Sequence, residues 1–192
     1  MSPPADKPRL LLHACCAPCS TVPLERLRGR YQVSLFFFGP NIHPRAEYLA
    51  RLEEVRRFCL AANVPLIEGP YRPADWGRAV LPFRALPEGS ERCAACFRLR
   101  LQATAREAKV RGLDAFSATL SIGRQKKSAQ VAQAGRAASQ AEGIAFHEED
   151  FKKGGGFDRS VVLSKGLGLR RQEYCGCALS RERQRSPRGA RP

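Results

Sequence analysis

Seven of the eight cysteines in this 192-residue chain gather in three short segments. The groups are Cys15, Cys16 and Cys19 in LLHACCAPCS, Cys93 and Cys96 in ERCAACF, and Cys175 and Cys177 in YCGC. Three thiols within five residues are rarely a packing solution, so the pattern indicates metal binding or redox chemistry.

The first two groups can supply four thiolates to one metal centre. Cys15 and Cys16 directly follow a predicted buried strand, at the edge where open parallel sheets bind their ligands. Cys93 and Cys96 begin a predicted helix, where a spacing of three puts both on one face and the helix dipole favours the thiolate. Four thiolates suit either a zinc ion or a four-iron cluster, and spacing alone leaves both open.

Cys175 and Cys177 form a different kind of pair. A disulfide across one intervening glycine closes a small, strained ring, and strained disulfides are labile and oxidising. The pair suits an electron relay, with two further metal ligands or two unreactive core thiols as the alternatives. Seven clustered thiols exceed the needs of one structural zinc ion, which favours redox chemistry. Cys59 lies on the apolar stripe of a predicted helix, so we expect it in the core.

The composition indicates the compartment and the kind of partner. The first fourteen residues hold only a short apolar run, too short for a signal peptide or a membrane span, so we expect a cytoplasmic protein with no membrane partner. Lys and Arg number 33 against 18 Asp and Glu, a net charge of +15 that favours a polyanionic partner. An Arg-rich surface without a nucleic-acid role is the alternative that charge leaves open.

Alternating strand and helix patterns position these residues. Strands are predicted at 10–14, 31–38, 64–67, 114–119 and 144–147, and helices from near Ser20 to Gly29, over 41–63, from a cap at Ser90 to Lys109 and over 128–142. A short helix around Trp76 is predicted within the connection 68–90. This order predicts an α/β fold, a Rossmann-like parallel sheet flanked by helices. We expect a single catalytic domain over 1–180 and a basic, disordered tail over 181–192.

Six further side chains are candidate substrate contacts: Asn41, His43, Tyr48, Lys152, Lys153 and Tyr174. The first three follow the second strand at the same sheet edge as the first cysteine group, with helix capping by Asn41 as the alternative. The two lysines precede three glycines whose amides could converge on a phosphate, and a flexible surface loop is the alternative there. Tyr174, beside the third cysteine pair, is a candidate to stack on an unpaired base.

Four segments in their order resemble the cobalamin-independent epoxyqueuosine reductases across residues 9–180. They are LLHACCAPCS, NIHPRAEYLARL, ERCAACFRLRLQATA and FKKGGGFDRSVVLSKGLGLRRQEYCGC. The resemblance implies an adenine-nucleotide-hydrolase-like variant of the Rossmann-like sheet. It also implies a [4Fe–4S] cluster held by Cys15, Cys16, Cys93 and Cys96.

The same resemblance implies the remaining cysteine roles and the reaction. Cys175 and Cys177 would form a redox-active disulfide, and Cys19 would help to hold a second, mononuclear metal, iron, that could act as a Lewis acid. The reaction is the two-electron deoxygenation of epoxyqueuosine to queuosine in the anticodon loop of tRNA with a GUN anticodon, the last step of queuosine biosynthesis. The electrons would come from an unidentified donor.

The sequence departs from this family at Ser121–Ser128, SIGRQKKS, where relatives carry a serine–proline turn. Arg124, Lys126 and Lys127 remain candidates for phosphate contact in this segment.

Two other functions stay open. A tRNA sulfur transferase with a cluster would need a serine- and glycine-rich phosphate loop after the first strand, and CCAPCS is not one. A non-catalytic zinc module that binds RNA would be colourless and free of iron after anaerobic purification.

Overall fold

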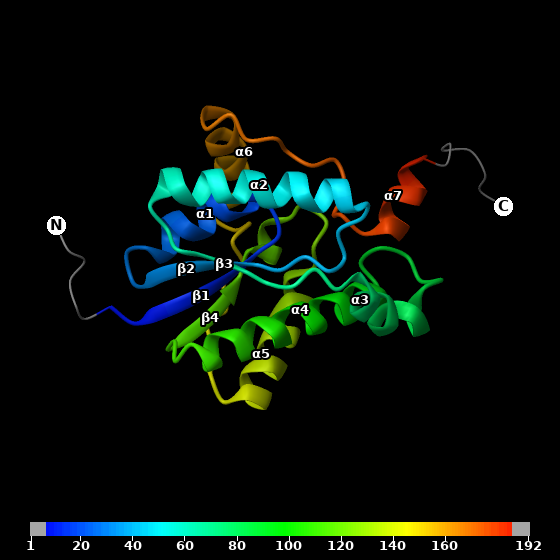
Figure 1. Cartoon of the computed structure of the whole chain (residues 1–192), viewed down its shortest axis with the longest axis horizontal. Coiled ribbons are helices and arrows are strands. Elements are labelled where there is room, and N and C mark those ends of the chain that lie inside the picture. The colour runs from blue at the N-terminus through cyan, green and yellow to red at the C-terminus, as the bar shows by residue number, and fades with distance from the viewer. Residues whose placement is uncertain (1–6, 186–192) are drawn as a thin grey trace.

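One parallel sheet lies between two layers of helices in the computed structural model, which describes residues 7–185 (Figure 1). Within these residues the sheet has five strands in the order β3-β2-β1-β4-β5, all pairing in parallel. The strands are β1 (Arg9–Ala14), β2 (Gln32–Phe37), β3 (Leu66–Glu68), β4 (Ala115–Ala118) and β5 (Ala145–Phe146). The predicted α/β class with a parallel sheet is confirmed.

The helices divide between the two faces of the sheet (Figure 1). One face carries α1 (Ala17–Leu27), α2 (Arg45–Ala62) and α6 (Gly156–Gly166). The other carries α3 (Pro73–Val80), α4 (Glu91–Val110) and α5 (Ser128–Glu142), while α7 (Ala178–Arg185) lies at one end of the molecule. Two short 3₁₀ segments, η1 (Leu81–Phe83) and η2 (Thr119–Ile122), complete the described elements.

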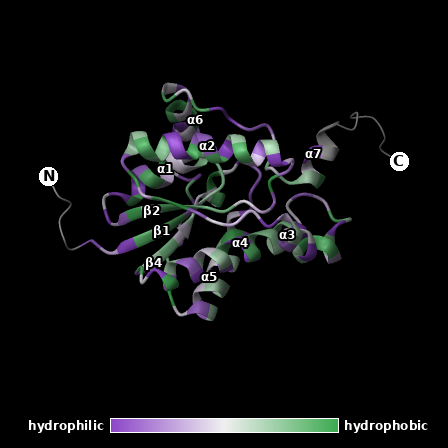
Figure 2. Cartoon of the chain, viewed as in Figure 1, coloured by the Kyte–Doolittle hydropathy of each residue, from purple (hydrophilic) through white to green (hydrophobic). Residues whose placement is uncertain are grey.

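The central strand, β1, is apolar on both faces of the sheet, so helices must cover both faces to bury it. Leu10, Leu11 and Leu12 of β1 are all fully buried, as expected for a parallel strand between two helical layers. Leu10 lies opposite Val33 of β2 on one side and Ala115 of β4 on the other. Figure 2 shows the resulting hydrophobic colouring of the central strands.

The chain changes direction across the sheet at β1. From β1 it proceeds to β2 and β3 on one side, and it then returns to place β4 and β5 on the other. Open parallel sheets bind ligands at such a switch point, beyond the carboxyl ends of the strands. Cys15 and Cys16 directly follow β1, and Thr119 directly follows β4, so these residues border that position.

Two predicted helix starts are wrong, and prolines are the reason. α1 begins at Ala17, with Pro18 in its first turn and Pro23 inside it, so Cys19 belongs to the helix itself. α2 begins at Arg45 after an extended Pro44, because a residue that precedes proline is disfavoured in the helical region. Asn41 therefore does not cap α2. By contrast, α5 covers the predicted range and α4 begins after Ser90 as predicted.

The pattern predicts neither α6 nor α7. α7 runs through Arg185, so residues 181–185 of the expected disordered tail are helical, and 186–192 lie outside the described residues. Within the described part of the chain, every helix is too short or too polar to cross a lipid bilayer.

Candidate active site

The three cysteine groups meet around two neighbouring cavities at the carboxyl edge of the sheet. The larger cavity, of about 290 Å³, has Cys15, Cys16, Cys19 and Cys175 in its walls. The smaller, of about 20 Å³, is lined by Cys93, Cys96, Cys175 and Cys177. Cys175 belongs to both walls, so the seven clustered cysteines of the sequence form one connected site.

Burial and mutual hydrogen bonds favour the protonated form of the first pair of thiols. Cys15 and Cys16 are 9% and 2% exposed. The hydrogen bond to Cys16 and then burial raise the pKa of Cys15 well above its ordinary value. For Cys16, the hydrogen bond from Cys15 lowers the pKa, but the bond to Cys19 and burial outweigh it, so the pKa is raised.

The second pair occupies the first turns of α4, as predicted. The backbone N–H of Gly89 donates to Cys93 Sγ at 3.2 Å. Burial raises the pKa of Cys96, with the nearby Arg100 charge opposing it. Burial of Cys96 thus opposes the thiolate form that the helix terminus is expected to favour.

A buried arginine lies between the two cysteine pairs. Arg100 is 3% exposed, and Cys15 and Cys96 lie close enough to raise the pKa of its guanidinium against the effect of burial. Nε lies 3.2 Å from Nε2 of His13, whose pKa is lowered well below its ordinary value by burial and then by the Arg100 charge. Nη2 has no hydrogen-bond partner, and within residues 7–185 no carboxylate forms an ion pair with this guanidinium. A permanent positive charge is thus buried among sulfur atoms.

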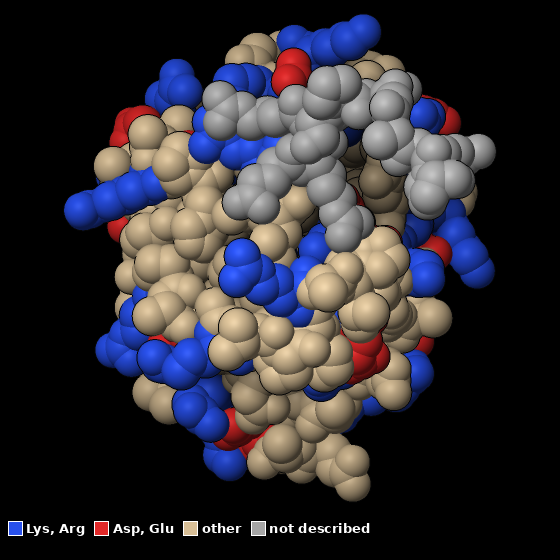
Figure 3. Space-filling view, turned by 90° about the vertical axis from the view of Figure 1, so that its right-hand side faces the viewer, with Lys and Arg blue, Asp and Glu red and all other residues tan. Residues whose placement is uncertain are grey.

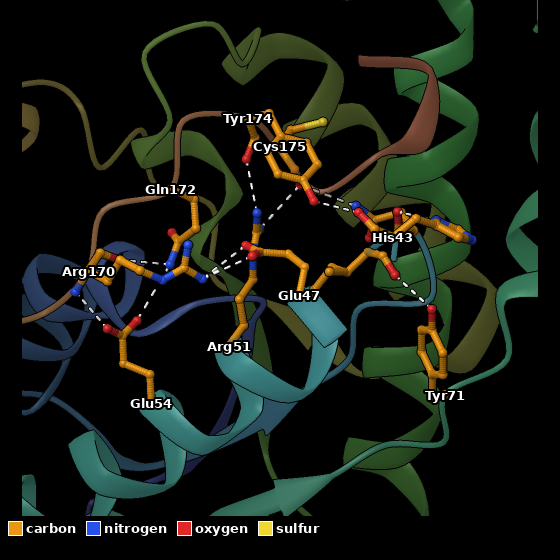
Figure 4. A network of polar contacts seen from close by, with 11 residues as sticks. His43, Glu47, Arg51, Glu54, Tyr71, Arg170, Gln172, Tyr174 and Cys175 are labelled. Carbon is orange, nitrogen blue, oxygen red and sulfur yellow. Dashed lines mark hydrogen bonds and ion pairs between the residues drawn. The ribbon is translucent and has the colours of Figure 1, made fainter. Parts of the chain in front are cut away.

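The YCGC segment is held in place by side chains from the other side of the site (Figure 4). Arg51, only 2% exposed, donates to the carbonyl oxygen of Tyr174 at 3.0 Å and pairs with Glu47 at 2.7 Å. Asn41 Nδ2 donates to the Cys175 carbonyl oxygen at 3.4 Å. The N–H of His43 donates to the Gly176 carbonyl oxygen at 2.8 Å, and the Tyr174 hydroxyl donates back to the carbonyl of His43.

Gly176 makes the close approach of this segment possible. Its φ is +98°, a conformation that favours glycine. A Cβ at this position would lie 2.9 Å from Ile42 Cγ1 and 3.2 Å from Arg51 Nη1. The turn between the two thiols is therefore packed directly against the segment that precedes α2.

The two thiols of YCGC are electrostatically unequal. The thiol of Cys177 hydrogen-bonds to Cys175 and lowers the pKa of Cys175 well below its ordinary value, against the effect of burial. The Lys126 ammonium lowers it further, and the donor role of Cys177 raises the pKa of that thiol. Lys126 is mostly buried and pairs with Glu88 at 3.1 Å. Lys126 lines both cavities, and a phosphate contact from its ammonium stays a prediction.

The candidate substrate contacts separate into different places. Tyr174 lines the larger cavity and Asn41 the smaller, where Oδ1 of Asn41 has no hydrogen-bond partner. His43 Nδ1 interacts with the carbonyl of Asn41 at 2.9 Å, so its ring belongs to the support of the YCGC segment.

Three other candidates lie outside both cavity walls. Tyr48 is 5% exposed and stacks on Tyr71 at 4.0 Å, so it is a core residue. The Lys152 ammonium donates to the carbonyl of Lys126. Lys153 is exposed, and its carbonyl accepts from Arg26 at 2.8 Å.

Sequence reasoning missed three buried polar residues of the site. Arg51 and Arg100 had a spacing signal, because Arg51 follows Tyr48 by three positions and Arg100 follows Cys96 by four, each on a predicted inward face. Thr119 had none. It is fully buried in the wall of the larger cavity, and its Oγ1 has no hydrogen-bond partner.

The donor atoms do not converge on a single point. Within residues 7–185, no three His, Cys, Asp or Glu side chains are close enough to hold one metal ion. The cysteines are instead distributed around the walls of the two neighbouring cavities.

The chain is similar to one family of known proteins over most of its length. The family model described as epoxyqueuosine reductase QueH matches residues 10–183. An epoxyqueuosine reductase QueH of Acinetobacter baylyi is 39% identical over 179 residues, which cover 92% of this chain and 82% of the relative. That of Thermotoga maritima is 36% identical over 174 residues, 89% of either chain. That of Staphylococcus epidermidis is 33% identical over 187 residues, 93% of this chain and 79% of the relative.

Proposed function

The chain belongs to the family of QueH epoxyqueuosine reductases, and we propose that it performs their reaction at the larger cavity, between Cys19 and Cys175. It is an oxidoreductase whose substrate is tRNA that carries epoxyqueuosine. The reaction cleaves both carbon–oxygen bonds of the epoxide, takes up two electrons and two protons, and leaves a carbon–carbon double bond and water. The comparisons favour neither a sulfur transferase nor a zinc module.

The observation that carries the placement of the reaction is the meeting of all seven clustered cysteines around two cavities that share Cys175. A cavity of about 290 Å³ is at the lower end of the size of small-molecule sites, which suits one modified base. Its buried Thr119 hydroxyl, which lacks a partner, offers a hydrogen bond to an oxygen of the substrate.

The proposal includes a [4Fe–4S] cluster held by Cys15, Cys16, Cys93 and Cys96. A four-iron cluster takes one thiolate at each iron, so its ligands surround a volume and need not converge on one ion. The buried Arg100 supports this fit, because an unpaired guanidinium between Cys15 and Cys96 is strongly disfavoured unless negative charge lies beside it. When bound, the cluster would supply electrons one at a time.

Cys175 and Cys177 are proposed to carry reducing equivalents into the site. Oxidation of this dithiol to a disulfide releases two electrons and two protons, which is the number that the deoxygenation consumes. An external dithiol or flavin-type reductant would then reduce the disulfide again. A second mononuclear iron at Cys19 does not enter the proposal, since the described residues offer no group of three donors for a single ion.

The test is anaerobic turnover of tRNA that contains epoxyqueuosine, followed by digestion and mass spectrometry of the nucleosides. We expect conversion to queuosine with dithionite as reductant, in protein that contains iron and sulfide. The Cys59→Ser variant, altered at a core thiol outside the site, serves as control and should convert equally. Iron-loaded protein that binds the tRNA but leaves epoxyqueuosine unchanged would contradict the proposal.

A further inference from the structure

Two arginines flank one aromatic ring in the wall of the larger cavity. Phe157 lies in the first turn of α6, and the guanidinium carbon of Arg124 is 4.9 Å from its ring centroid. The guanidinium carbon of Arg171 is 5.5 Å from the same centroid. The three residues come from the segment after η2, from α6 and from the segment after α6, and all three line the cavity that holds Cys19 and Cys175.

The two arginines are open to solvent. Both side chains are exposed, and no ion pair to either of them is found within residues 7–185. Arg171 is instead oriented by neutral groups, the carbonyl of Ser160 and the hydroxyl of Ser164 at 3.3 and 3.1 Å.

Other basic residues near the site are already engaged. Arg170 precedes Arg171 in the chain, but its guanidinium binds Glu47 at 3.1 Å. Lys126 binds Glu88, and the ammonium of Lys152 donates to a backbone carbonyl. The side of the molecule that carries α7 bears more Lys and Arg than Asp and Glu (Figure 3), and the contacts single out Arg124 and Arg171 as available for a ligand on the cavity rim.

A ring that contacts two guanidinium groups holds them in place before any ligand arrives. Cation–π contacts of this kind restrict the guanidinium planes and leave their N–H edges available. Those edges match phosphate oxygens in a bidentate manner, which a lysine ammonium does not. The cavity therefore presents two preorganised phosphate binders in the same wall as Cys19 and Cys175.

We propose that Arg124 and Arg171, positioned by Phe157, bind the backbone phosphates on either side of the nucleotide whose base enters the cavity. The inference rests on the proposed function for the identity of that nucleotide. It names the anticodon-loop backbone, and not the tRNA body, as the partner of this surface. Binding should accordingly need only a stem–loop and should weaken with salt by counterion release.

The test measures the affinity of the iron-loaded enzyme for an anticodon stem–loop RNA with a GUN anticodon over a series of salt concentrations. Arg124→Gln and Arg171→Gln should each weaken binding and reduce the slope of log affinity against log salt by about 0.7, the value for one phosphate contact in a single strand. The double variant should lose about twice as much. Phe157→Leu should weaken binding while it retains most of the slope, because both charges remain.

Arg159→Gln is the matched control, since Arg159 is exposed on the same helix but pairs with Glu25 at 3.0 Å. Its slope should equal that of the wild type, and the visible spectra of all variants should match. Unchanged slopes in both single variants, or an equal loss in Arg159→Gln, would overturn the inference. Because binding is measured without turnover, a protein that shows these slopes yet reduces no epoxyqueuosine would refute the proposed function alone.

Discussion

Arg51 donates a hydrogen bond from Nη2 to the carbonyl oxygen of Tyr174 across 3.0 Å, and so ties α2 to the segment that carries the third cysteine pair. The same guanidinium pairs with Glu47 and lies 5.4 Å from the centre of the Tyr174 ring. One buried cation thus organises both the backbone and the aromatic side chain that precede Cys175.

Replacement of Arg51 by methionine should loosen this segment. Glu47 keeps Arg170 as a partner in this variant. The Tyr174 carbonyl loses its donor, however, and an unsatisfied buried acceptor typically costs about 1–3 kcal/mol. We expect a lower free energy of unfolding in guanidinium chloride and faster thiol labelling at Cys175. Arg56→Gln on the solvent face of the same helix should change neither, because exposed pairs contribute little. Equal stability of Arg51→Met and Arg56→Gln would contradict the role given to Arg51.

Iron content should depend jointly on the two cysteine pairs. Serine at Cys15, Cys16, Cys93 or Cys96 removes one thiolate ligand, so each variant should lose most of its iron and its broad visible absorbance. The measurement is iron and sulfide analysis of anaerobically purified protein, with Cys59→Ser as the buried control. Full iron and sulfide in two or more of the four variants would remove the ligand assignment.

Cys175 and Cys177 should be separable from iron binding. The double serine variant should keep its iron and visible spectrum but lose turnover with a dithiol or flavin-type reductant, because the relay is gone. Dithionite, which can reduce the site without the dithiol, should partly restore a single turnover. Loss of iron in the double variant would instead make these cysteines metal ligands, and Cys19 would then be reassigned with them.

The unequal thiols of this pair should appear in the pH dependence of alkylation. Because the pKa of Cys175 is lowered, it remains a reactive thiolate at pH values where an ordinary thiol is protonated, and its rate falls only as the pH drops through the lowered pKa. Lys126→Met removes a favourable charge and should move this profile to higher pH. Lys127→Met, at the neighbouring exposed lysine, should leave it in place. Mass spectrometry of reduced protein after iodoacetamide pulses gives both profiles, and identical profiles for the two variants would rule out the Lys126 effect.

The elements that carry the cysteines were predictable because local signals agree with tertiary packing. The unbroken apolar run of β1 belongs to a strand buried on both faces, and Ser90 precedes α4 as the capping preference suggests. The start of α2 was misplaced because the effect of Pro44 on the preceding residue outweighs the periodic pattern.

The arrangement of the site was only partly predictable. The cysteine types and spacings predicted that the groups act together, and the structure places all seven in the walls of two neighbouring cavities. The position of the YCGC segment depends on hydrogen bonds from Arg51 and Asn41 to backbone carbonyls, and such contacts leave no periodic trace in a sequence. Thr119 could not be predicted either, because it is singled out only by a buried hydroxyl that has no hydrogen-bond partner in the fold.

Gly176 packs the turn between Cys175 and Cys177 against a distant segment of the chain. With φ at +98° and no room for a Cβ against Ile42, the segment cannot exchange this residue without displacing the turn that precedes α2. Asn41, in the same turn, is 134 positions from the Cys175 carbonyl to which it donates. The backbone position of the turn that carries the two cysteines is therefore maintained by a distant part of the chain, and engineering of this turn would have to alter both segments together.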